Sequence, residues 1–402
     1  MTRSDPLSGW NGPPASGPWW LQPACLFDGE RLREAVAVRI EQGRVSAVAP
    51  ADEAGRDGAP CWRTEWLACP AFVDLQVNGG GGVLFTHEPT AEALATIAAA
   101  HRLGGTGAWF PTLITSAPQA MEQAVDAVLA LYGRHGVVGI HIEGPHIAAE
   151  FRGAHARELI RPFDEHTRKL LRRLRERSVP VLITLAPERL PAGVLRELVD
   201  MGVRVSIGHS AATEEQTRVA LREGASFFTH LFNGMPPLQT KKVGMTGVAL
   251  DSDAWCGIIA DGHHVDDTMV RLAVRAKRKP NTLFAVTDAM PTVHGPSAFE
   301  LYGAKISVRD GRLIDARGSL AGVHIDMIGT LRRLVQPIGL PLETALAMVS
   351  AIPARAVGLH PEYGYLQPRS RAAIALLDPG ELELRQLLID GQPVNQPVAA
   401  IA

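Results

Sequence analysis

Short apolar runs alternate with helix-like stretches through the middle of the chain, and this alternation is the strongest pattern in the sequence. Amphipathic helix patterns occupy, for example, residues 89–103, 165–178 and 266–278. Such alternation is typical of a parallel β-sheet whose strands are connected by crossover helices. The apolar runs, interpreted as strands, occupy residues 71–77, 108–114, 137–143, 180–186, 204–209, 226–232, 255–261 and 282–289.

Eight strands of this kind predict an α/β fold of the (β/α)8 barrel type. An open, doubly wound sheet is the alternative, but the four glycines at 79–82 do not form the G-x-G-x-x-G pattern with which such folds bind dinucleotides. Those glycines are interpreted as a flexible loop after the first strand. The stretch 233–254 interrupts the alternation, and we expect a long loop there.

The two ends of the chain carry a different, strand-like pattern. Short alternating segments with turns occur between 21 and 68 and again between 372 and 400, where Asp390-Gly391 marks a turn. We therefore expect one small sheet domain built from residues 19–69 together with 361–402. The barrel then spans 70–360, and the Gly-, Pro- and Ser-rich residues 1–18 form a loose arm.

Composition and charge exclude several classes of protein. Lys and Arg number 40 against 42 Asp and Glu, so the chain lacks the basic excess that nucleic-acid or anionic-membrane binding requires. No apolar stretch is long enough to span a bilayer, and the N-terminus has no apolar signal-peptide segment. The four cysteines contain no C-x-x-C pair, which argues against a disulfide framework or a cysteine-rich zinc site. A cytoplasmic protein is expected.

Chemically useful side chains cluster at the carboxyl ends of the predicted strands. Glu143, His209, His230 and Asp288 come from four separate strands, and in a barrel these ends meet on the face where active sites are built. A single histidine in such a place is more often part of the core, but the whole set is improbable by chance. Other polar residues follow the same strand ends: Gln76, Asn78, His141, Asp261, His263 and His264.

The set predicts a catalytic metal centre. Glu143, His209 and His230 offer one oxygen and two nitrogens, which suit Zn²⁺ and similar divalent ions, and three protein ligands leave a fourth position for water. Asp288 is placed to accept a proton from that water, although it is also interpretable as a helix N-cap after the eighth strand. His141 points the same way as Glu143 but lies deeper, so we expect it behind the ligands or in the core.

At these residues the chain resembles the amidohydrolase superfamily and, within it, the N-acetylglucosamine-6-phosphate deacetylases. The resemblance runs in order through about residues 70–360. It rests on the segments PAFVDLQVNGGGGVLF, GIHIEGPHI, RGAH, SIGHSAAT, THLFNGMPPL, GIIADGHHV, VTDAMP, SLAGVHIDMIGTLRRLV and SAIPARAVGL.

The resemblance implies a distorted barrel, a small β-sandwich and a homodimer. It implies hydrolysis of N-acetylglucosamine 6-phosphate to glucosamine 6-phosphate and acetate, with the metal on Glu143, His209 and His230. Asp288 would be the catalytic carboxylate, and His155 would stabilise the developing oxyanion. The substrate-binding positions implied in this sequence are Ala154, His155, Asn233, Gly234, His264, Ala321, Gly322 and Val323.

Two departures from the family pattern change the expectations. Gln76 and Asn78 stand where many amidohydrolases have two histidines, and neutral amides bind metals poorly, so we expect one divalent ion per subunit. Zn²⁺ is the first expectation, with Fe²⁺, Co²⁺ or Mn²⁺ as alternatives. Lys241 and Lys242 replace the family's phosphate-loop arginine; they offer charge without a bidentate fork, and a solvated turn is the alternative interpretation. By analogy, this loop lies near the neighbouring subunit's site.

Other functions stay open from the sequence alone. The enzyme could deacylate another N-acyl amino sugar, either the galacto epimer or an unphosphorylated sugar, and the lysine replacement slightly favours a substrate without phosphate. A non-catalytic scaffold on an old enzyme fold is opposed because Glu143, His209, His230 and Asp288 are all present.

Overall fold

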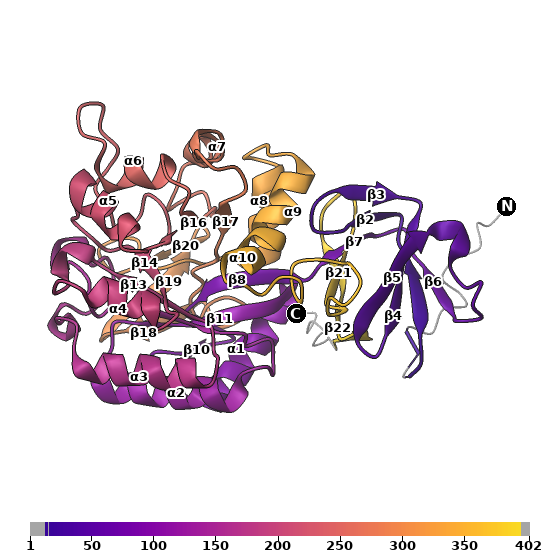
Figure 1. Ribbon diagram of the computed structural model, residues 1–402, viewed down its shortest axis with the longest axis horizontal. Helices are drawn as coiled ribbons and strands as arrows, with labels where there is room; N and C mark the ends of the chain where they lie inside the picture. Colours follow the sequence, from indigo (N-terminus) through magenta and orange to yellow (C-terminus); the bar gives the residue numbers. More distant parts are fainter. Residues whose placement is uncertain (1–12, 15, 395–402) are drawn as a thin grey trace.

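Eight parallel strands form the central sheet of the computed structural model, which describes residues 13–14 and 16–394. Neighbouring strands pair in chain order, and each overlaps one of the predicted apolar runs, so the predicted (β/α)8 fold class is confirmed (Figure 1). The strands are β8 (Phe72–Val77), β11 (Thr106–Ile114), β12 (Ile140–Glu143), β13 (Val181–Leu185), β14 (Arg204–Ile207), β15 (Phe227–Phe228), β16 (Trp255–Ile258) and β17 (Leu283–Ala285).

The barrel closes through a narrow seam between its first and last strands. β8 and β17 do not pair along their length; a single parallel bridge joins Val77 to Ala289. The Asp288 N–H also donates to the Gln76 carbonyl at 2.9 Å, and the Asn78 N–H donates to the Ala289 carbonyl at 3.0 Å. The seam is therefore where the barrel is distorted, and it brings Gln76, Asn78 and Asp288 together.

Helices cover the outside of the sheet, and the three predicted helices lie where expected. In α3, Asp164 caps the first turn by accepting from the Thr167 N–H, and Leu170 and Leu174 are buried against the barrel. The helices around the barrel are α1 (Ala91–Leu103), α2 (Pro118–Leu131), α3 (Glu165–Glu176), α4 (Val194–Asp200), α5 (Glu214–Arg222), α7 (Asp267–Ala276), α8 (Met327–Val335), α9 (Leu342–Val349) and α10 (Ala351–Ala356).

The expectation of one long loop over residues 233–254 is wrong in its second half. Helix α6 (Gly244–Leu250) forms there, and its residues Met245 and Val248 are fully buried. The Thr246 hydroxyl ties the helix to the preceding chain by donating to the Pro236 carbonyl at 2.6 Å. Burial of this apolar face outweighs the poor helix propensity of the glycines, so only the residues before α6 form an extended loop.

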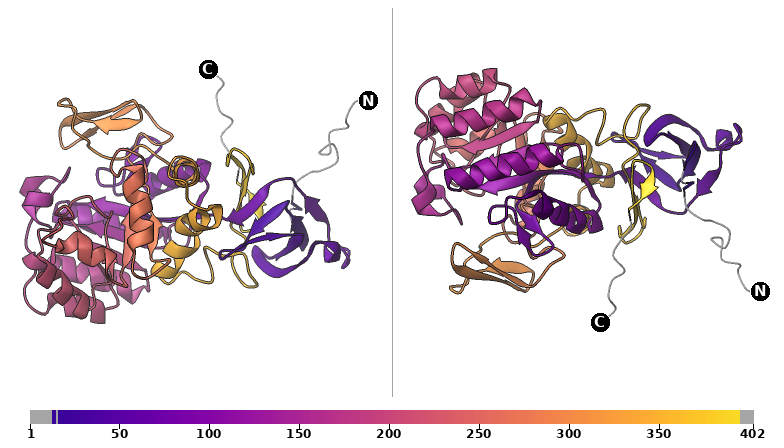
Figure 2. Two further views of the ribbon diagram at one scale, coloured as in Figure 1. Left: turned by 90° about the horizontal axis from the view of Figure 1, so that it is seen from above. Right: turned by 90° about the horizontal axis from the view of Figure 1, so that it is seen from below.

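A three-stranded antiparallel sheet between β17 and α8 was not expected from the sequence. It consists of β18 (Ala298–Leu301), β19 (Ala304–Arg309) and β20 (Arg312–Ile314), and we call it the flap. Figure 2 shows it in orange, projecting from the barrel. Its apolar residues share a small core with groups around the barrel mouth: Leu84, Ile114, Met290, Leu301, Ile306, Leu313 and Ala321.

Smaller elements complete the structure. The glycines at 79–82 take part in a short hairpin of β9 (Gly79–Gly80) and β10 (Val83–Leu84) rather than in an open loop. Single 3₁₀ turns are η1 (Ala51–Glu53), η2 (Ala149–Phe151), η3 (Arg157–Leu159) and η4 (Pro187–Arg189). Among the described residues, none of the helices has the length and apolar character to cross a membrane.

Both ends of the chain build two further sheets, which lie to one side of the barrel in Figure 1. Apolar side chains such as Trp19, Leu21 and Leu388 form the core that these strands share. One sheet contains β1 (Trp19–Gln22), β4 (Val36–Glu41), β5 (Arg44–Pro50) and β6 (Cys61–Arg63). The other contains β2 (Cys25–Phe27), β3 (Leu32–Glu34), β7 (Leu67–Pro70), β21 (Ile374–Leu377), β22 (Leu384–Ile389) and β23 (Gln392–Pro393).

The strand pairing links the two ends of the chain directly. β7 pairs with β21 antiparallel, so an N-terminal and a C-terminal strand are neighbours in one sheet. The exact division of the chain into 19–69 with 361–402, and 70–360, stays a prediction. Most of the expected arm at 1–18, and residues 395–402, lie outside the described residues.

Candidate active site

A cavity of about 250 Å³ opens at the carboxyl ends of the barrel strands, the face on which (β/α)8 enzymes carry their chemistry. Polar and apolar groups both line it, as is usual for a small-molecule site. The lining residues are Asn78, Ile114, Glu143, Gly153, Ala154, His155, His209, His230, Asn233, Gly234, Ile259, His264, Asp288, Met290, Leu320 and Gly322.

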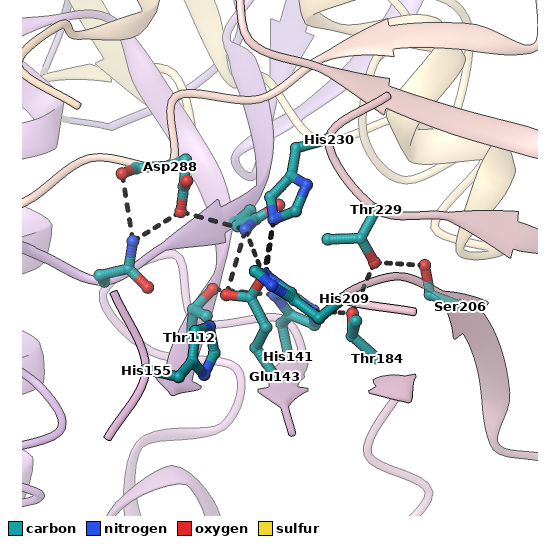
Figure 3. Close-up of polar contacts among 12 residues, drawn as sticks. Thr112, His141, Glu143, His155, Thr184, Ser206, His209, Thr229, His230 and Asp288 are labelled. Carbon is teal, nitrogen blue, oxygen red and sulfur yellow. Dashed lines mark hydrogen bonds and ion pairs between the residues drawn. The ribbon is translucent and has the colours of Figure 1, made fainter. Parts of the chain in front are cut away.

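Glu143, His209 and His230 converge at the bottom of this cavity (Figure 3). Glu143 Oε1 lies 3.1 Å from His209 Nε2 and 3.0 Å from His230 Nε2, and the two histidine nitrogens are 3.0 Å apart. Ligands of a tetrahedral metal with bonds of about 2.0–2.1 Å stand about 3.3 Å from one another, so a small outward movement of this triangle would accommodate an ion. All three side chains are buried.

The hydrogen bonds of His209 prepare it for metal binding. Its Nδ1 lies 2.7 Å from the Phe151 carbonyl, an obligatory acceptor, so Nδ1 carries a proton and Nε2 is the atom that faces Glu143. Gly234 lies directly against the other side of this ring. A Cβ at residue 234 would come within 2.9 Å of His209 Nδ1, which explains why this chain has glycine there.

The backbone is strained at three of these positions. His209, His230 and Asp288 adopt φ values of +47°, +25° and +50°, a region that non-glycine residues rarely occupy. Each residue lies just beyond the end of its strand, where the chain turns out of the barrel. Such strain persists when the surrounding structure enforces it, and it is concentrated at functional sites.

Charge coupling sets the protonation of the triangle. Burial alone would raise the pKa of Glu143, but hydrogen bonds from His209 and His230 hold it well below its usual value. Burial alone would lower the pKa of His230, but its hydrogen bond to Glu143 and the carboxylate charge raise it to about 8. The metal-free site thus holds a carboxylate that attracts positive charge, whether a proton or a metal ion.

Another histidine lies near the same carboxylate. A ring nitrogen of His155, a ring nitrogen of His209 and an oxygen of Glu143 all lie within 4.8 Å of one another. These three atoms could also hold a metal ion. The contacts of 3.0–3.1 Å among Glu143, His209 and His230 make a tighter set, and Nδ1 of His155 is already engaged by Thr115 at 2.7 Å. The geometry therefore favours His230 over His155 as the third ligand.

Asp288 lines the same cavity and is held by two amide side chains, one in β8 and one just beyond its end. Gln76 Nε2 donates to Asp288 Oδ1 at 3.0 Å and also to both Glu143 oxygens at 3.2 Å. Asn78 Nδ2 donates to the same Asp288 oxygen at 2.7 Å. Burial, followed by the Glu143 charge, raises the pKa of Asp288 to about 6, which makes this carboxylate a stronger proton acceptor than an ordinary aspartate.

His155 and His264 flank the cavity with one ring nitrogen each already engaged. His155 Nδ1 lies 2.7 Å from Thr115 Oγ1, and burial lowers the pKa of this ring to about 3, so it stays neutral. His264 Nδ1 lies 2.7 Å from Asp261 Oδ2. Despite its burial, Asp261 has a pKa of about 2 because His264 and nearby backbone N–H groups donate to it.

The remaining predicted residues divide into two groups. Ala154, Asn233, Gly234 and Gly322 line the cavity, whereas Ala321 and Val323, on either side of Gly322, do not. Lys241 and Lys242 lie on an exposed turn before α6 and do not reach the cavity of their own chain.

His141 lies inside the barrel, below the ligands, as expected. Its ring contacts Thr112 Oγ1 at 3.1 Å and Thr184 Oγ1 at 2.7 Å, and this chain of buried groups continues through Thr229 to Ser206 (Figure 3). Burial lowers the pKa of His141 to about 4. His141 is thus held by hydroxyl groups and does not reach the Glu143–His209–His230 triangle through any of these contacts.

Some residues of the site were missed by the sequence argument. Ile114, Met290 and Leu320 form its apolar wall, and Thr115 contacts His155 from behind. Thr115 directly follows the second strand, so the strand-end rule that found Glu143 could have found it. Leu320 follows the flap and has no comparable signal in the sequence.

Comparisons with known proteins agree with this geometry. The model of the amidohydrolase family matches residues 67–401. An N-acetylgalactosamine-6-phosphate deacetylase of Shewanella sp. (strain ANA-3) is 40% identical over 312 residues, 76% of this chain and 78% of that protein. An N-acetylglucosamine-6-phosphate deacetylase of Haemophilus influenzae is 33% identical over 314 residues, 77% and 81% of the two chains. The crystal structure of N-acetylglucosamine-6-phosphate deacetylase from Pasteurella multocida matches with a TM-score of 0.88 at 30% identity, covering 94% of this chain and 100% of that one.

Proposed function

The chain belongs to the amidohydrolase family, and on this premise we propose that it is a metal-dependent deacetylase of N-acetylglucosamine 6-phosphate. The products are glucosamine 6-phosphate and acetate. The observation that carries the proposal is the placement of the Asp288 carboxylate in one cavity with the Glu143–His209–His230 triangle. Deacetylases at 33% and 40% identity support the reaction type.

The residues have separate tasks in this reaction. When bound to Glu143, His209 and His230, a divalent ion supplies Lewis-acid activation of water and of the acetamide carbonyl. Asp288 accepts the proton of the attacking water and then transfers it to the nitrogen of the departing amine, so the carboxylate is regenerated. His155 donates a hydrogen bond to the developing oxyanion. Asn233, Gly234, His264 and the backbone at 321–323 hold the sugar phosphate.

We expect one divalent ion per chain, with Zn²⁺ as the native metal. The triangle offers a complete ligand set, whereas Gln76 and Asn78 use their amide groups to hold Asp288 and Glu143 and offer no second set. Elemental analysis of protein purified without added metal should give about one ion per subunit. Two ions per subunit, both required for activity, would contradict this.

The galacto epimer is the second candidate substrate. The relative at 40% identity is an N-acetylgalactosamine-6-phosphate deacetylase, whereas the glucosamine relative from Haemophilus influenzae is 33% identical. Acetate release should be measured with both epimers, each with and without the 6-phosphate, on protein of known metal content. The proposal expects the highest kcat/KM for N-acetylglucosamine 6-phosphate. A clear preference for N-acetylgalactosamine 6-phosphate would change the proposed substrate to the galacto epimer. The proposed deacetylation reaction would stay the same.

Lys241 and Lys242 are proposed to bind the phosphate. Replacing both with Ala should lower kcat/KM for the phosphorylated sugar by roughly ten- to a hundredfold, because hydrogen bonds to charged groups contribute about 1.5–3 kcal/mol. The unphosphorylated sugar should be unaffected. Lys279→Ala, at another exposed turn, is the matched control. Equal losses for both sugars would mean that the lysines form only a solvated turn.

We further propose a cytoplasmic homodimer in which this loop serves the partner's site, since the lysines do not reach the cavity of their own chain. The test mixes equal amounts of an Asp288→Asn chain and a Lys241→Ala/Lys242→Ala chain under exchanging conditions. A trans arrangement gives one intact site in each mixed dimer. Activity on the phosphosugar should then approach on the order of a quarter of the wild-type value, because half of the dimers are mixed. If a demonstrated mixed dimer shows no recovery of activity, the loop serves the site of its own chain.

A further inference from the structure

Thr115 contacts the catalytic-site residue His155 on the side that faces away from the cavity. Its hydroxyl oxygen lies 2.7 Å from His155 Nδ1, and its backbone N–H donates to the same nitrogen at 3.3 Å. Thr115 is fully buried and His155 nearly so, which means that bulk water does not compete for these contacts. One ring nitrogen of His155 is therefore approached by two groups of a single residue.

The backbone contact decides which nitrogen carries the proton of a neutral His155. An N–H group can only donate, so the nitrogen that receives it must present a lone pair. A proton on Nδ1 would face the Thr115 N–H and leave that buried donor without a partner, which is costly in a site closed to water. With the lone pair on Nδ1, the Thr115 hydroxyl donates to it as well, and the proton belongs on Nε2.

We propose that Thr115 is a positioning residue that keeps the proton of neutral His155 on Nε2, the nitrogen available to a ligand in the cavity. His155 then offers an N–H donor, and not a lone pair, to the acetamide oxygen. This arrangement also separates His155 from the metal ligands, because a ligand must present a lone pair where His155 presents hydrogen. Its catalytic consequence rests on the proposed deacetylase function; the position of the proton does not.

Two neighbouring groups hold Thr115 in this position. The Tyr302 hydroxyl, at the turn between β18 and β19 of the flap, donates to the Thr115 carbonyl at 2.9 Å. Gly144, at φ +76°, lies against the Thr115 side chain, and a Cβ there would come within 2.4 Å of Thr115 Oγ1. The hydroxyl therefore has little freedom to turn away from His155. The hydrogen bond from Tyr302 to Thr115 thus connects the flap with the active site.

The position of the proton can be measured without any activity. In metal-free protein labelled with ¹⁵N-histidine, long-range ¹H–¹⁵N spectra distinguish the two neutral tautomers, and loss of one signal set in His155→Asn assigns the ring. We expect unprotonated Nδ1 and protonated Nε2 for His155 in the wild type. A wild-type ring protonated on Nδ1 would overturn the inference, whether or not the protein proves to be a deacetylase.

Variants of Thr115 then connect the tautomer with turnover. Thr115→Val keeps the shape and the backbone N–H but removes the hydroxyl, so the proton of His155 should stay on Nε2 while the ring loses one of the two groups that orient it. The value of kcat should fall about two- to tenfold, the range for one net hydrogen bond, with KM within about twofold. Thr115→Ser restores the hydroxyl and should restore kcat. Thr217→Val in α5, which removes an equally buried hydroxyl that donates to the Thr213 carbonyl, is the matched control and should change neither the tautomer of His155 nor kcat. A Thr115→Val protein whose His155 is protonated on Nδ1, or whose kcat equals that of the wild type, would also overturn the inference.

Discussion

Asp288→Asn is expected to lower kcat by at least about 10²–10⁴-fold while the fold and the metal content persist. The amide keeps the shape of the side chain, and its oxygen can still accept from Gln76 and Asn78, which hold Asp288 Oδ1 at 3.0 and 2.7 Å. It cannot accept the proton of the attacking water, and general acid–base catalysis contributes a factor of this size. Steady-state acetate release, thermal unfolding and elemental analysis on the same preparation measure the three quantities.

The control for this variant is Asp253→Asn, on an exposed turn, which should keep wild-type turnover. Activity of Asp288→Asn within a few-fold of wild type, on fully metal-loaded protein, would move the base to another group. His264, with its Nδ1 held by Asp261, would then be the next residue to replace.

Glu143→Gln should have a second large effect, on metal binding and through it on activity. Glu143 Oε1 is the atom shared by the contacts to both His209 and His230, so its charge holds the triangle together. Loss of a direct ligand should weaken metal binding by more than the roughly 10–100-fold that orienting partners of metal ligands contribute. Turnover at limiting metal should fall in proportion.

Thermal unfolding gives an independent reading of the same variant. Metal at 100 times its Kd stabilises the native state by about 2.7 kcal/mol, so a chelator should lower the Tm of the wild type and of the surface control Glu176→Gln. The Tm of Glu143→Gln should not respond. An equal chelator response in Glu143→Gln would show that the ion binds elsewhere, for example through His155.

The strand-end rule explains why so much of the site could be predicted. Parallel strands bring their carboxyl ends to one face, so recognising the apolar runs was enough to place Glu143, His209, His230 and Asp288 close together. Short apolar strands separated by helices are a local pattern, and tertiary contacts are not needed to find them. The same rule would have found Thr115, one residue beyond its strand.

Features set by tertiary packing were not predictable in the same way. α6 forms in a glycine-containing segment because its apolar face is buried against the barrel, a contact that local propensity does not contain. Lys241 and Lys242 carry charge in the sequence, but their distance from the cavity depends on the path of the preceding loop. The flap did have a signal, since Asp310-Gly311 between alternating residues is typical of a tight hairpin.

The seam between β8 and β17 has a consequence for how the enzyme acquires its activity. The proposed metal ligands lie between residues 143 and 230 of the chain, whereas Asp288 and Gln76, which contact each other, are 212 residues apart in the sequence. Contacts between residues so far apart in the sequence are expected to form late in folding, because closing a long loop costs conformational entropy. During synthesis, the three ligands leave the ribosome before the carboxylate and before the strand that completes the ring. We therefore expect that a nascent chain can present the three proposed ligands before it can hydrolyse its substrate, and that activity begins only when the last strand meets the first.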